Sequence, residues 1–470
     1  MSAVLSRLKR HKVGAVVALM IAVRVVFLIA FAPLLDFTAA GDAIHGSDAY
    51  DAYARNLLSE GVYGREPGQP DAMIPPLYSY MLAGTYAIFG RTLAAIGLLH
   101  ITLDVLSLLL LIDIGRRLFP QQKLWGDAVG DWVGVLAGVF YALYPYLIFQ
   151  NLTLIDTPLW IFWLHLFVWL LILLRERPRL DMATWGVAIL AGLVLGLSLL
   201  TRPIMPVLAL MAALWFLLRL NLWQSFIRLL PVALVGALVL VPWIARNTAL
   251  FDAFVPMTTT SGANLWQGNN AMTVPVFRAG YDVQWLAPET IAPRQTREAD
   301  AERFQLVIDY WRENPQALPE LFWVKFLIHW SVEITPRRNP QPNEQFALSE
   351  DGQLLIVQGD ASISGVNAAN IAYDSGLLDT LGRPVHVIYF GGLLVLAVIG
   401  FVLSLRLWRS VSLLWFVQIS MTLIYVLFHP STRYRAPSDP LLFLLSAYAL
   451  VALAQYWQAR RKRPIETVRP

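Results

Sequence analysis

Residues 13–35 read VGAVVALMIAVRVVFLIAFAPLL, an apolar run in which Arg24 is the one charged residue. The run is longer than the ~20 residues that a helix needs to cross the hydrocarbon core of a membrane. Basic residues precede it, namely Arg7, Lys9, Arg10 and Lys12. A secretory signal peptide would have a shorter apolar core and a cleavage site of small residues. We therefore expect a retained membrane-spanning helix that begins in the cytoplasm.

The composition of the whole chain points to the same class of protein. Of the 470 residues, 57% are hydrophobic and 14% are charged, whereas soluble domains have roughly 25% charged residues. A transmembrane β-barrel would show ~10-residue segments of alternating hydropathy, but the apolar runs here are continuous. The net charge of +4 is too small to indicate nucleic acid as a partner. No cysteine is present to form a disulfide or a thiolate metal site.

Ten apolar runs are long enough to be spans, and the sequence predicts an all-α membrane protein of about 10 (10–12) transmembrane helices. The runs lie at about 13–35, 93–114, 128–148, 156–174, 183–200, 204–219, 228–245, 386–405, 411–428 and 438–456. Residues 318–334 are also apolar, but they include Glu320, Lys325, His329 and Glu333. We therefore expect a helix that lies at the membrane interface there. Ten spans place both ends of the chain in the cytoplasm.

The distribution of Lys and Arg predicts which turns face the cytoplasm, because these residues favour that side. The basic turns and the tail hold Arg116, Arg117, Lys123, Arg175, Arg177, Arg179, Arg219, Arg228, Arg406, Arg409, Arg460, Arg461, Lys462 and Arg463. The turns between them carry almost no positive charge, and residues 151–157 carry none. The two longest connecting segments then fall on the outer side.

This topology predicts one membrane domain with most of its additional mass outside. Its expected parts are a single domain over 1–470, a first outer loop over 36–92, a large outer loop over 246–385 and a basic cytoplasmic tail over 457–470. The first loop contains two amphipathic stretches at 48–60 and 77–89, the second following a helix-starting Pro75-Pro76 pair. The large loop contains an amphipathic stretch around 300–313. No internal repeat is evident.

Carboxylates are scarce in this chain, and a pair of them follows the first apolar run. Residues 46–53 read GSDAYDAY and include Asp48 and Asp51. Asp48 is a candidate general base at the outer face, although Asp or Ser also suits the N-cap of a helix starting there. Asp51 could share that role or complement the helix dipole. Asp156 reads equally as an N-cap and as a second active-site carboxylate.

Several short motifs in a fixed order carry a family resemblance. They are Arg24, Asp48 with Tyr50, Pro75-Pro76-Leu77-Tyr78, Phe89-Gly90, Gly115-Arg116-Arg117-Leu118-Phe119, Asp156, Thr201-Arg202-Pro203, Pro242-Trp243-Ile244-Ala245-Arg246-Asn247 and Arg433-Tyr434-Arg435. Together they resemble the GT-C superfamily of membrane glycosyltransferases. More narrowly, the chain is similar to the bacterial branch related to protein O-mannosyltransferases and the lipid A aminoarabinose transferase.

The resemblance implies a sugar donor linked to polyprenyl phosphate, used outside the cytoplasmic membrane, and an aspartate of the first outer loop as catalytic base. By position that residue is Asp48. The family's acidic pair usually continues with Glu, where this chain has Ala49. The aminoarabinose branch has an acidic-Lys pair before its double proline, where this chain has Met73 and Ile74. Neither the substrate nor the metal of that branch is therefore carried over.

The chemistry of such a donor needs few groups, because a phosphate is already a good leaving group. A base must take the proton of the acceptor hydroxyl, and cations must stabilise the departing phosphate. A single carboxylate that assists direct displacement predicts inversion at the anomeric carbon. The phosphate candidates are Arg246, Asn247, Arg433, Arg435 and, with weaker support, Arg202. Guanidinium groups bind phosphate in a bidentate manner, but arginines at an interface also bind ordinary phospholipid head groups.

Arg24 lies in the middle of a span, where an unpaired charge costs ~2.5–3.5 kcal/mol on insertion scales. We expect it to face the bundle interior and to pair with Asp104 or Asp113. The substrate-binding candidates are Tyr50, Tyr78, Trp266, Asn269 and Tyr434. Trp266 lies among amides in an outer loop, a composition typical of sugar sites, but loop tryptophans also dip into lipid.

No metal site is predicted from ligand spacing, because His100, His165 and His329 form no recognisable motif. A divalent cation bridged by Asp48 is left open. The expected partners are the lipid-linked donor, membrane lipids and a glycan, lipid or protein hydroxyl acceptor. The alternative function is a transporter or flippase of lipid-linked sugars, which would place charges at the bilayer midplane and show related halves. A non-catalytic scaffold would not explain cations gathered at one face.

Overall fold

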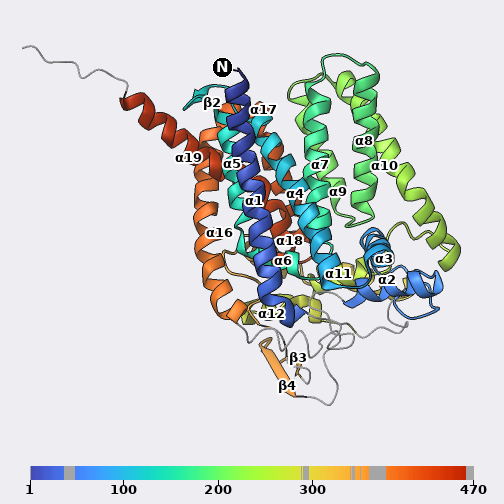
Figure 1. Cartoon of the computed structure of the whole chain (residues 1–470). Coiled ribbons are helices and arrows are strands. Elements are labelled where there is room, and N and C mark those ends of the chain that lie inside the picture. Colours follow the sequence, from blue (N-terminus) through green and yellow to red (C-terminus); the bar gives the residue numbers. More distant parts are fainter. Residues whose placement is uncertain are drawn as a thin grey trace, which may run out of the picture.

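The computed structural model describes residues 2–35, 48–286, 288, 296–338, 340, 344–349, 351–358 and 377–461. Helices make up nearly all of its secondary structure (Figure 1). Among the described residues, seven helical segments are long and apolar enough to cross a membrane, and eight if the bent pair Val129–Ala142 and Pro145–Leu152 is one span. The prediction of an all-α polytopic membrane fold is confirmed.

The apolar runs of the sequence all become helices. They are α1 (Ser2–Leu35), α4 (Leu93–Leu118), α5 (Val129–Ala142), α6 (Pro145–Leu152), α7 (Thr157–Glu176), α8 (Met182–Leu199), α9 (Met205–Leu217), α10 (Leu222–Phe251), α16 (Leu377–Ser404), α17 (Trp408–Leu427) and α19 (Asp439–Arg461). The number of candidate spans is below ten for two reasons. The 13-residue α9 is short for a span, and α16 and α17, joined by the 3-10 turn η3 (Leu405–Leu407), pass as one segment.

One expected span, 128–148, is not a continuous helix. It is divided into α5 and α6, which are bent by 56° relative to each other. Tyr144 lies at the break with extended backbone angles, φ −68° and ψ 110°, and Pro145 starts α6. The residue before a proline is disfavoured in the helical region, so the sequence itself causes the break. The bend brings the chain after α6 back into the protein toward Asp156.

The remaining elements lie mostly at one end of the bundle (Figure 1). They are α2 (Asp48–Glu60), α3 (Leu77–Phe89), α11 (Ser261–Gln267), α12 (Thr273–Ala279), η1 (Val283–Trp285), α13 (Arg297–Glu313), η2 (Pro315–Ala317), α14 (Leu318–His329), β3 (Glu344–Leu348), β4 (Leu354–Gln358), α18 (Thr432–Arg435) and η4 (Ala436–Ser438). The helices expected at 48–60 and 77–89 have those bounds. The β3–β4 hairpin, which closes at Leu348 and Leu354, was not predicted. A second short hairpin, β1 (Lys123–Leu124) with β2 (Asp127–Ala128), lies at the opposite end.

Arg24 faces the bundle interior, as expected, and its partner is Asp104. The Nε of Arg24 donates to the Asp104 carboxylate at 2.9 Å, and Nη1 donates to the Ala142 carbonyl at 2.7 Å. Tyr141 and Asn151 donate to the same carboxylate at 2.8 and 3.0 Å. This buried charge pair is thus neutralised and hydrogen-bonded, which ties α1, α4, α5 and α6 together.

Glycines allow the closest contacts between helices. A Cβ at Gly134 of α5 would lie 2.3 Å from the Ile112 carbonyl oxygen of α4. A Cβ at Gly196 of α8 would lie 2.5 Å from Cβ of Val239 on α10. Small residues at helix contacts let backbones approach closely in membrane proteins, where van der Waals packing drives helix association. These two glycines therefore determine how near α4 lies to α5 and α8 to α10.

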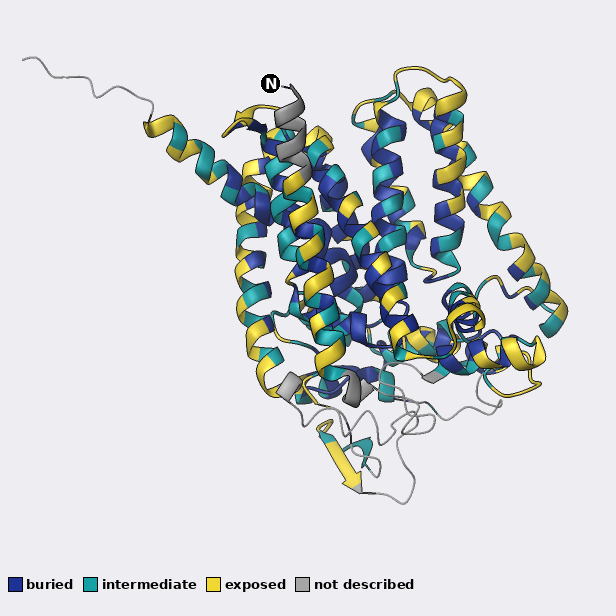
Figure 2. Ribbon diagram, in the orientation of Figure 1, coloured by how far each residue is buried: buried dark blue, intermediate teal, exposed yellow. Residues whose placement is uncertain are grey.

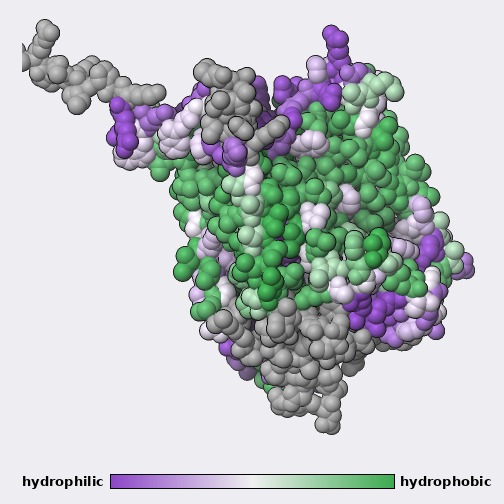
Figure 3. Space-filling view, in the orientation of Figure 1, coloured by the Kyte–Doolittle hydropathy of each residue, from purple (hydrophilic) through white to green (hydrophobic). Residues whose placement is uncertain are grey.

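The surface of the bundle is apolar where a membrane would contact it. Figure 3 shows a hydrophobic band across the helices, with hydrophilic residues at the end that carries the N-terminus and also at the lower right, toward the other end. Exposed positions on the outer helices include Ile29, Leu238 and Ile388, with exposed fractions of 70%, 66% and 78%. Figure 2 shows buried residues concentrated between the helices and exposed ones around the perimeter. Such a large exposed apolar surface fits lipid contact rather than water.

Candidate active site

Five side chains from four separate segments meet at the end of the bundle where α2 and α3 lie. They are Tyr50 of α2, Asp156 before α7, Arg202 between α8 and α9, and Arg433 with Tyr434 of α18. We call this group the Asp156 cluster. All five are site candidates on sequence grounds alone. The fold thus brings Tyr50, near the start of the chain, together with Arg433 and Tyr434, near its end.

The centre of the cluster is an ion pair between Asp156 and Arg202. The Nε of Arg202 donates to Oδ2 of Asp156 at 2.7 Å, and Nη2 donates to Oδ1 at 2.6 Å. Nη2 also donates to the Thr157 hydroxyl at 3.0 Å. Burial raises the pKa of the Asp156 carboxyl, but Arg202 outweighs burial and the net pKa lies below its ordinary value. Asp156 is therefore ionised, and its side chain does not cap α7.

Tyr50 places the start of α2 in this cluster. Its hydroxyl interacts with the Asp156 carboxylate, and its ring packs edge-on against Tyr78 with centroids 5.0 Å apart. Burial, and then the negative charge of Asp156, raises the pKa of the Tyr50 phenol above its ordinary value. Tyr50 therefore stays a neutral hydrogen-bond donor at any physiological pH.

Arg433 is the cation of the cluster that has no carboxylate of its own. Within the described part of the chain, its guanidinium makes no hydrogen bond or ion pair, and its Nε is buried without a partner. Its charge lies over the ring of Tyr434, 5.7 Å from the centroid. The Nη1 of Arg202 is likewise buried without a partner among the described residues. Within the five residues of the cluster, two guanidinium groups thus face one carboxylate, which leaves an excess positive charge and free donors.

A second carboxylate, for which the sequence carries no signal, belongs to the same neighbourhood. Asp282 precedes η1 in the long segment between α10 and α16, and it is buried. Burial raises the pKa of its carboxyl to about 6, although the nearby Arg433 and the backbone N–H of Gln284 act in the opposite direction. Burial, and with it the negative charge of Asp282, raises the pKa of the Tyr434 phenol, while Arg433 acts in the opposite direction. Only the fold reveals its position, since its local sequence, Gly280-Tyr281-Asp282, carries no spacing that indicates a site.

The segment between α1 and α3 holds the remaining acidic candidates. Asp48 is the first residue of α2, two positions before Tyr50, and its side chain lies outside the described residues. Asp51 is buried and accepts from Tyr86 at 2.8 Å and from Arg91 at 2.9 and 2.8 Å. It also pairs with Arg55 at 3.0 Å. Asp51 therefore connects α2 to the far end of α3 and is fully occupied by these partners.

Arg246 and Asn247 lie near the C-terminal end of α10, but their polar atoms bind carbonyl groups of the protein backbone. Arg246 donates to the carbonyls of Asp71 and Tyr63 at 2.6 and 2.8 Å. Asn247 is buried and donates to the Met257 carbonyl at 3.2 Å. Both side chains thus hold neighbouring chain segments against α10. Their hydrogen bonds are not made to residues of the Asp156 cluster. Their predicted role at the donor phosphate stays a prediction.

The other candidates also have structural partners. Arg435 is buried against Asp439, at 3.3 Å, inside the bundle. The Tyr78 hydroxyl lies 2.8 Å from Nε2 of His100. Asn269 donates to the Leu265 and Leu427 carbonyls at 2.7 and 2.9 Å, and Trp266 packs against an apolar cluster around Phe277. The roles predicted for these residues in substrate binding remain predictions.

Among the described residues, no group of three His, Asp or Glu side chains could hold a metal ion. The side chain of Asp48 lies outside those residues, so the divalent cation considered at Asp48 stays a prediction.

Comparison with known proteins gives a family match and several structural neighbours. Residues 73–245 match the family of dolichyl-phosphate-mannose-protein mannosyltransferases. That segment contains Asp156 and Arg202 but not Asp48, Asp282 or Arg433. No curated protein sequence matches the chain.

Solved structures of two other proteins are similar to this chain. The apo oligosaccharyltransferase from Archaeoglobus fulgidus is 13% identical, with a TM-score of 0.52 over 96% of this chain and 51% of the other. ArnT from Cupriavidus metallidurans, bound to undecaprenyl phosphate, is 15% identical, with a TM-score of 0.40 over 94% of this chain and 78% of the other. This chain thus spans about half the length of the oligosaccharyltransferase.

Proposed function

We propose that this multi-pass membrane protein is a glycosyltransferase of the GT-C type, a proposal that the family match over residues 73–245 and the similar fold support. The protein transfers a sugar from a polyprenyl-phosphate-linked donor to an acceptor hydroxyl at the outer face of a bacterial cytoplasmic membrane. Asp48 acts as general base, and the anomeric carbon is inverted.

The observation that carries this proposal is the half-buried Arg433 beside the Asp156–Arg202 pair. Its guanidinium, with a buried Nε, has no partner within the described part of the chain. An unpaired buried charge is costly unless an opposite charge joins it. A phosphate monoanion or dianion would neutralise the excess charge and accept from the free nitrogens of Arg433 and Arg202. As the glycosidic bond breaks, negative charge grows on the departing phosphate, so these donors act most strongly in the transition state.

The backbone of α2 supports Asp48 as the base. Asp48 starts this helix, and Tyr50, two residues later, reaches Asp156. The helix start is therefore held at the cluster where a phosphate would bind, and Asp51 fixes the same helix through Arg91 and Tyr86. A carboxylate there would take the proton of an acceptor hydroxyl that attacks the anomeric carbon from the side opposite the phosphate.

The charge distribution supports an outer location for the site. The N-terminal end of α1, the β1–β2 hairpin and the carboxyl end of α19 lie at one end of the bundle, and α2, α3, α11 and α12 lie at the other (Figure 1). The first of these ends carries Arg116 and Arg117 of α4 and Arg460 and Arg461 of α19. Because Lys and Arg favour the cytoplasmic side, the Asp156 cluster falls on the outer side.

The test uses membranes that contain the full-length protein and radiolabelled undecaprenyl-phosphate hexoses. We expect the label to leave its lipid carrier with the wild-type protein. With Asp48→Asn, which keeps the shape but cannot accept a proton, kcat should fall by about 10²–10⁴, the usual contribution of a general base. Wild-type turnover by Asp48→Asn would contradict the role of Asp48. Label that crosses the bilayer but stays on its carrier would favour the flippase alternative.

A further inference from the structure

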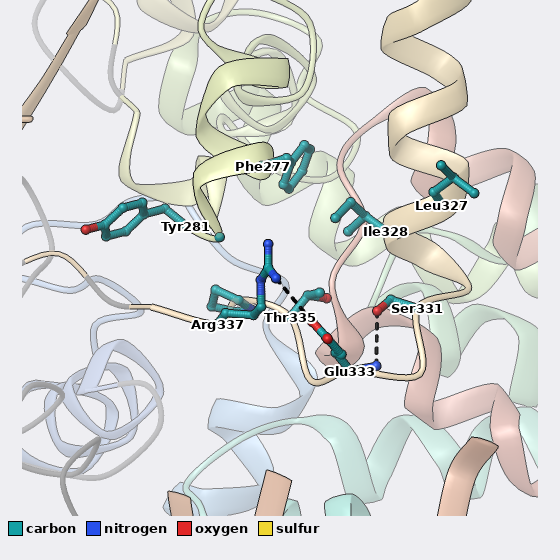
Figure 4. Close-up of a pocket in the computed structure, with 10 residues that line it drawn as sticks. Phe277, Tyr281, Leu327, Ile328, Ser331, Glu333, Thr335 and Arg337 are labelled. Carbon is teal, nitrogen blue, oxygen red and sulfur yellow. Dashed lines mark hydrogen bonds and ion pairs between the residues drawn. The ribbon is translucent and has the colours of Figure 1, made fainter. Parts of the chain in front are cut away.

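We propose that a small cavity next to the Asp156 cluster binds the terminal sugar residue of a glycan acceptor. This inference rests on the proposed transferase function and adds the class of the acceptor. The cavity, of about 210 Å³, lies between α12 with Gly280 and Tyr281 on one side and α14 with residues 331–337 on the other. In the view of Figure 4, the apolar side chains of Phe277, Ile328 and Leu327 lie above the polar side chains of Ser331, Glu333 and Arg337.

Both walls of the cavity are formed by chain segments that lead to the Asp156 cluster. Tyr281 lines the cavity, and the next residue, Asp282, lies in the field of Arg433. On the opposite wall, the backbone N–H of Thr335 donates to the Thr432 hydroxyl at 2.8 Å, and the N–H of Thr432 donates to the Thr335 carbonyl at 3.2 Å. Thr432 directly precedes Arg433. A ligand in the cavity and a phosphate on Arg433 would therefore be neighbours.

The walls are also fixed to each other. The backbone N–H groups of Arg337 and Arg338 donate to the Gly280 carbonyl at 2.8 and 2.9 Å. Gly280 has a φ of +90°, and a Cβ there would lie 3.2 Å from Nε of Arg337. Glycine meets both conditions because it has no side chain and tolerates positive φ. The cavity is therefore a built feature of the fold that needs no ligand to form.

The chemistry of the lining fits a sugar. A pyranose ring presents an apolar C–H face and a rim of hydroxyls, each of which donates and accepts. The cavity offers the ring of Phe277 and the side chain of Ile328 for the apolar face. At its polar edge, the Glu333 carboxylate can accept from hydroxyls and the Arg337 guanidinium can donate to them. These two side chains pair at 3.5 Å and are each 53% exposed, so the pair can open for a ligand at little cost.

The size of the cavity argues against the other acceptor classes. At about 210 Å³ it is smaller than the ~300–1,000 Å³ pockets that hold drug-sized ligands. A lipid acceptor would need a long apolar groove. A peptide in extended form would need a row of backbone hydrogen-bonding groups along its length. A single sugar residue at the end of a glycan matches both the volume and the mixed lining.

Binding can be tested without turnover, because the chain has no native cysteine. In the full-length Ser331→Cys variant, a maleimide reagent would alkylate the cavity wall, and the methyl glycosides of glucose, galactose and mannose are added as probes up to about 100 mM. We expect at least one glycoside to slow alkylation in a saturable manner. Absence of protection by every glycoside, or protection by a Ser/Thr peptide in their place, would overturn the proposal.

A matched pair of variants distinguishes the cavity from its surroundings. Glu333→Gln in the Ser331→Cys background should weaken the protection at least tenfold, and in the native background it should raise the KM for a glycan acceptor. Glu320→Gln breaks the exposed Arg278–Glu320 pair, at 2.5 Å, which joins the same two helices outside the cavity. That control should leave protection unchanged. Equal effects of the two variants would contradict the assignment of the cavity as a sugar site. Failure of Asp48→Asn to lower transfer would instead affect only the proposed function.

Discussion

At the scale of single residues, four arginines of the bundle differ in what their guanidinium groups contact. Arg24, Arg202 and Arg435 each have an aspartate partner, at 2.9, 2.6 and 3.3 Å. Arg433 has none among the described residues. Removing a paired arginine leaves a buried carboxylate uncompensated, whereas removing Arg433 relieves an unpaired charge. Variants of these residues should therefore separate stability from substrate binding.

We expect Arg433→Ala to fold and to lose donor binding. The donor KM should rise at least tenfold, and kcat should fall as well, because the phosphate contact tightens as the bond breaks. Arg433→Lys should recover part of the loss, since it restores a point charge without the planar fork. The measurement is steady-state transfer from undecaprenyl-phosphate hexose at varied donor concentration. Arg435→Ala is the comparison, and its main effect should be a lower thermal stability. An unchanged donor KM in Arg433→Ala would show that the phosphate binds elsewhere.

Asp282 should make donor binding depend on pH. Its folded pKa of about 6 lies above the ordinary value of 3.8, so the folded protein holds this proton more tightly than the unfolded chain. The stability it contributes is complete below about pH 4 and is lost as the pH rises through 6. Ionised Asp282 also competes with phosphate for the charge of Arg433. The donor KM should therefore rise between about pH 5 and 7, and Asp282→Asn should flatten that part of the profile.

At the scale of elements, α2 and α3 show what local sequence determines. Their amphipathic spacing and the Pro75-Pro76 pair predict both helices with the bounds observed. The hairpin of β3 and β4 was missed, because five-residue strands in a long loop give little periodic signal. The spacing of apolar residues determines the position of each helix along the chain, while its contacts depend on partners far away in sequence.

The same limit explains the candidate site. The sequence could propose Asp156, Arg202 and Arg433 as charged residues at outer turns, and they do meet. It could not tell that backbone carbonyls would occupy Arg246, because such bonds depend on how the first outer loop folds back on α10. Nor could it find Asp282, which the fold buries in the vicinity of Arg433.

The contacts of Asp51 predict a structural effect on α2. Its carboxylate is buried and joins Tyr86, Arg91 and Arg55. Removing one partner of a buried pair typically costs about 3–5 kcal/mol, so Asp51→Asn should loosen the first outer loop and increase its cleavage by added protease. Glu320→Gln, at an exposed pair worth about 0–1 kcal/mol, is the control. Full protease resistance together with lost turnover would instead favour a catalytic role for Asp51.

At the scale of the whole molecule, the outer and inner ends can be assigned by labelling. Gly268 is a poor position for a cysteine, because a Cβ there would lie 1.7 Å from the Phe428 carbonyl oxygen. Glu313 at the end of α13 and Gln121 near β1 are exposed. In intact cells, an impermeant maleimide should label Glu313→Cys and spare Gln121→Cys. The reverse pattern would put the Asp156 cluster on the cytoplasmic side, where a nucleotide-sugar donor would become the better proposal.

The position of α18 has a consequence for biosynthesis. Arg433 lies between α17 and the last described helix, α19, which packs against both α5 and α16. During translation, the membrane helices before it and both outer loops are made first, yet the cluster that begins with Tyr50 stays without this cation until α18 emerges. A ribosome-bound chain halted before residue 432 should therefore insert and fold much of its bundle while still unable to retain undecaprenyl phosphate. The chain should become able to bind the lipid carrier only after this late segment has been synthesised.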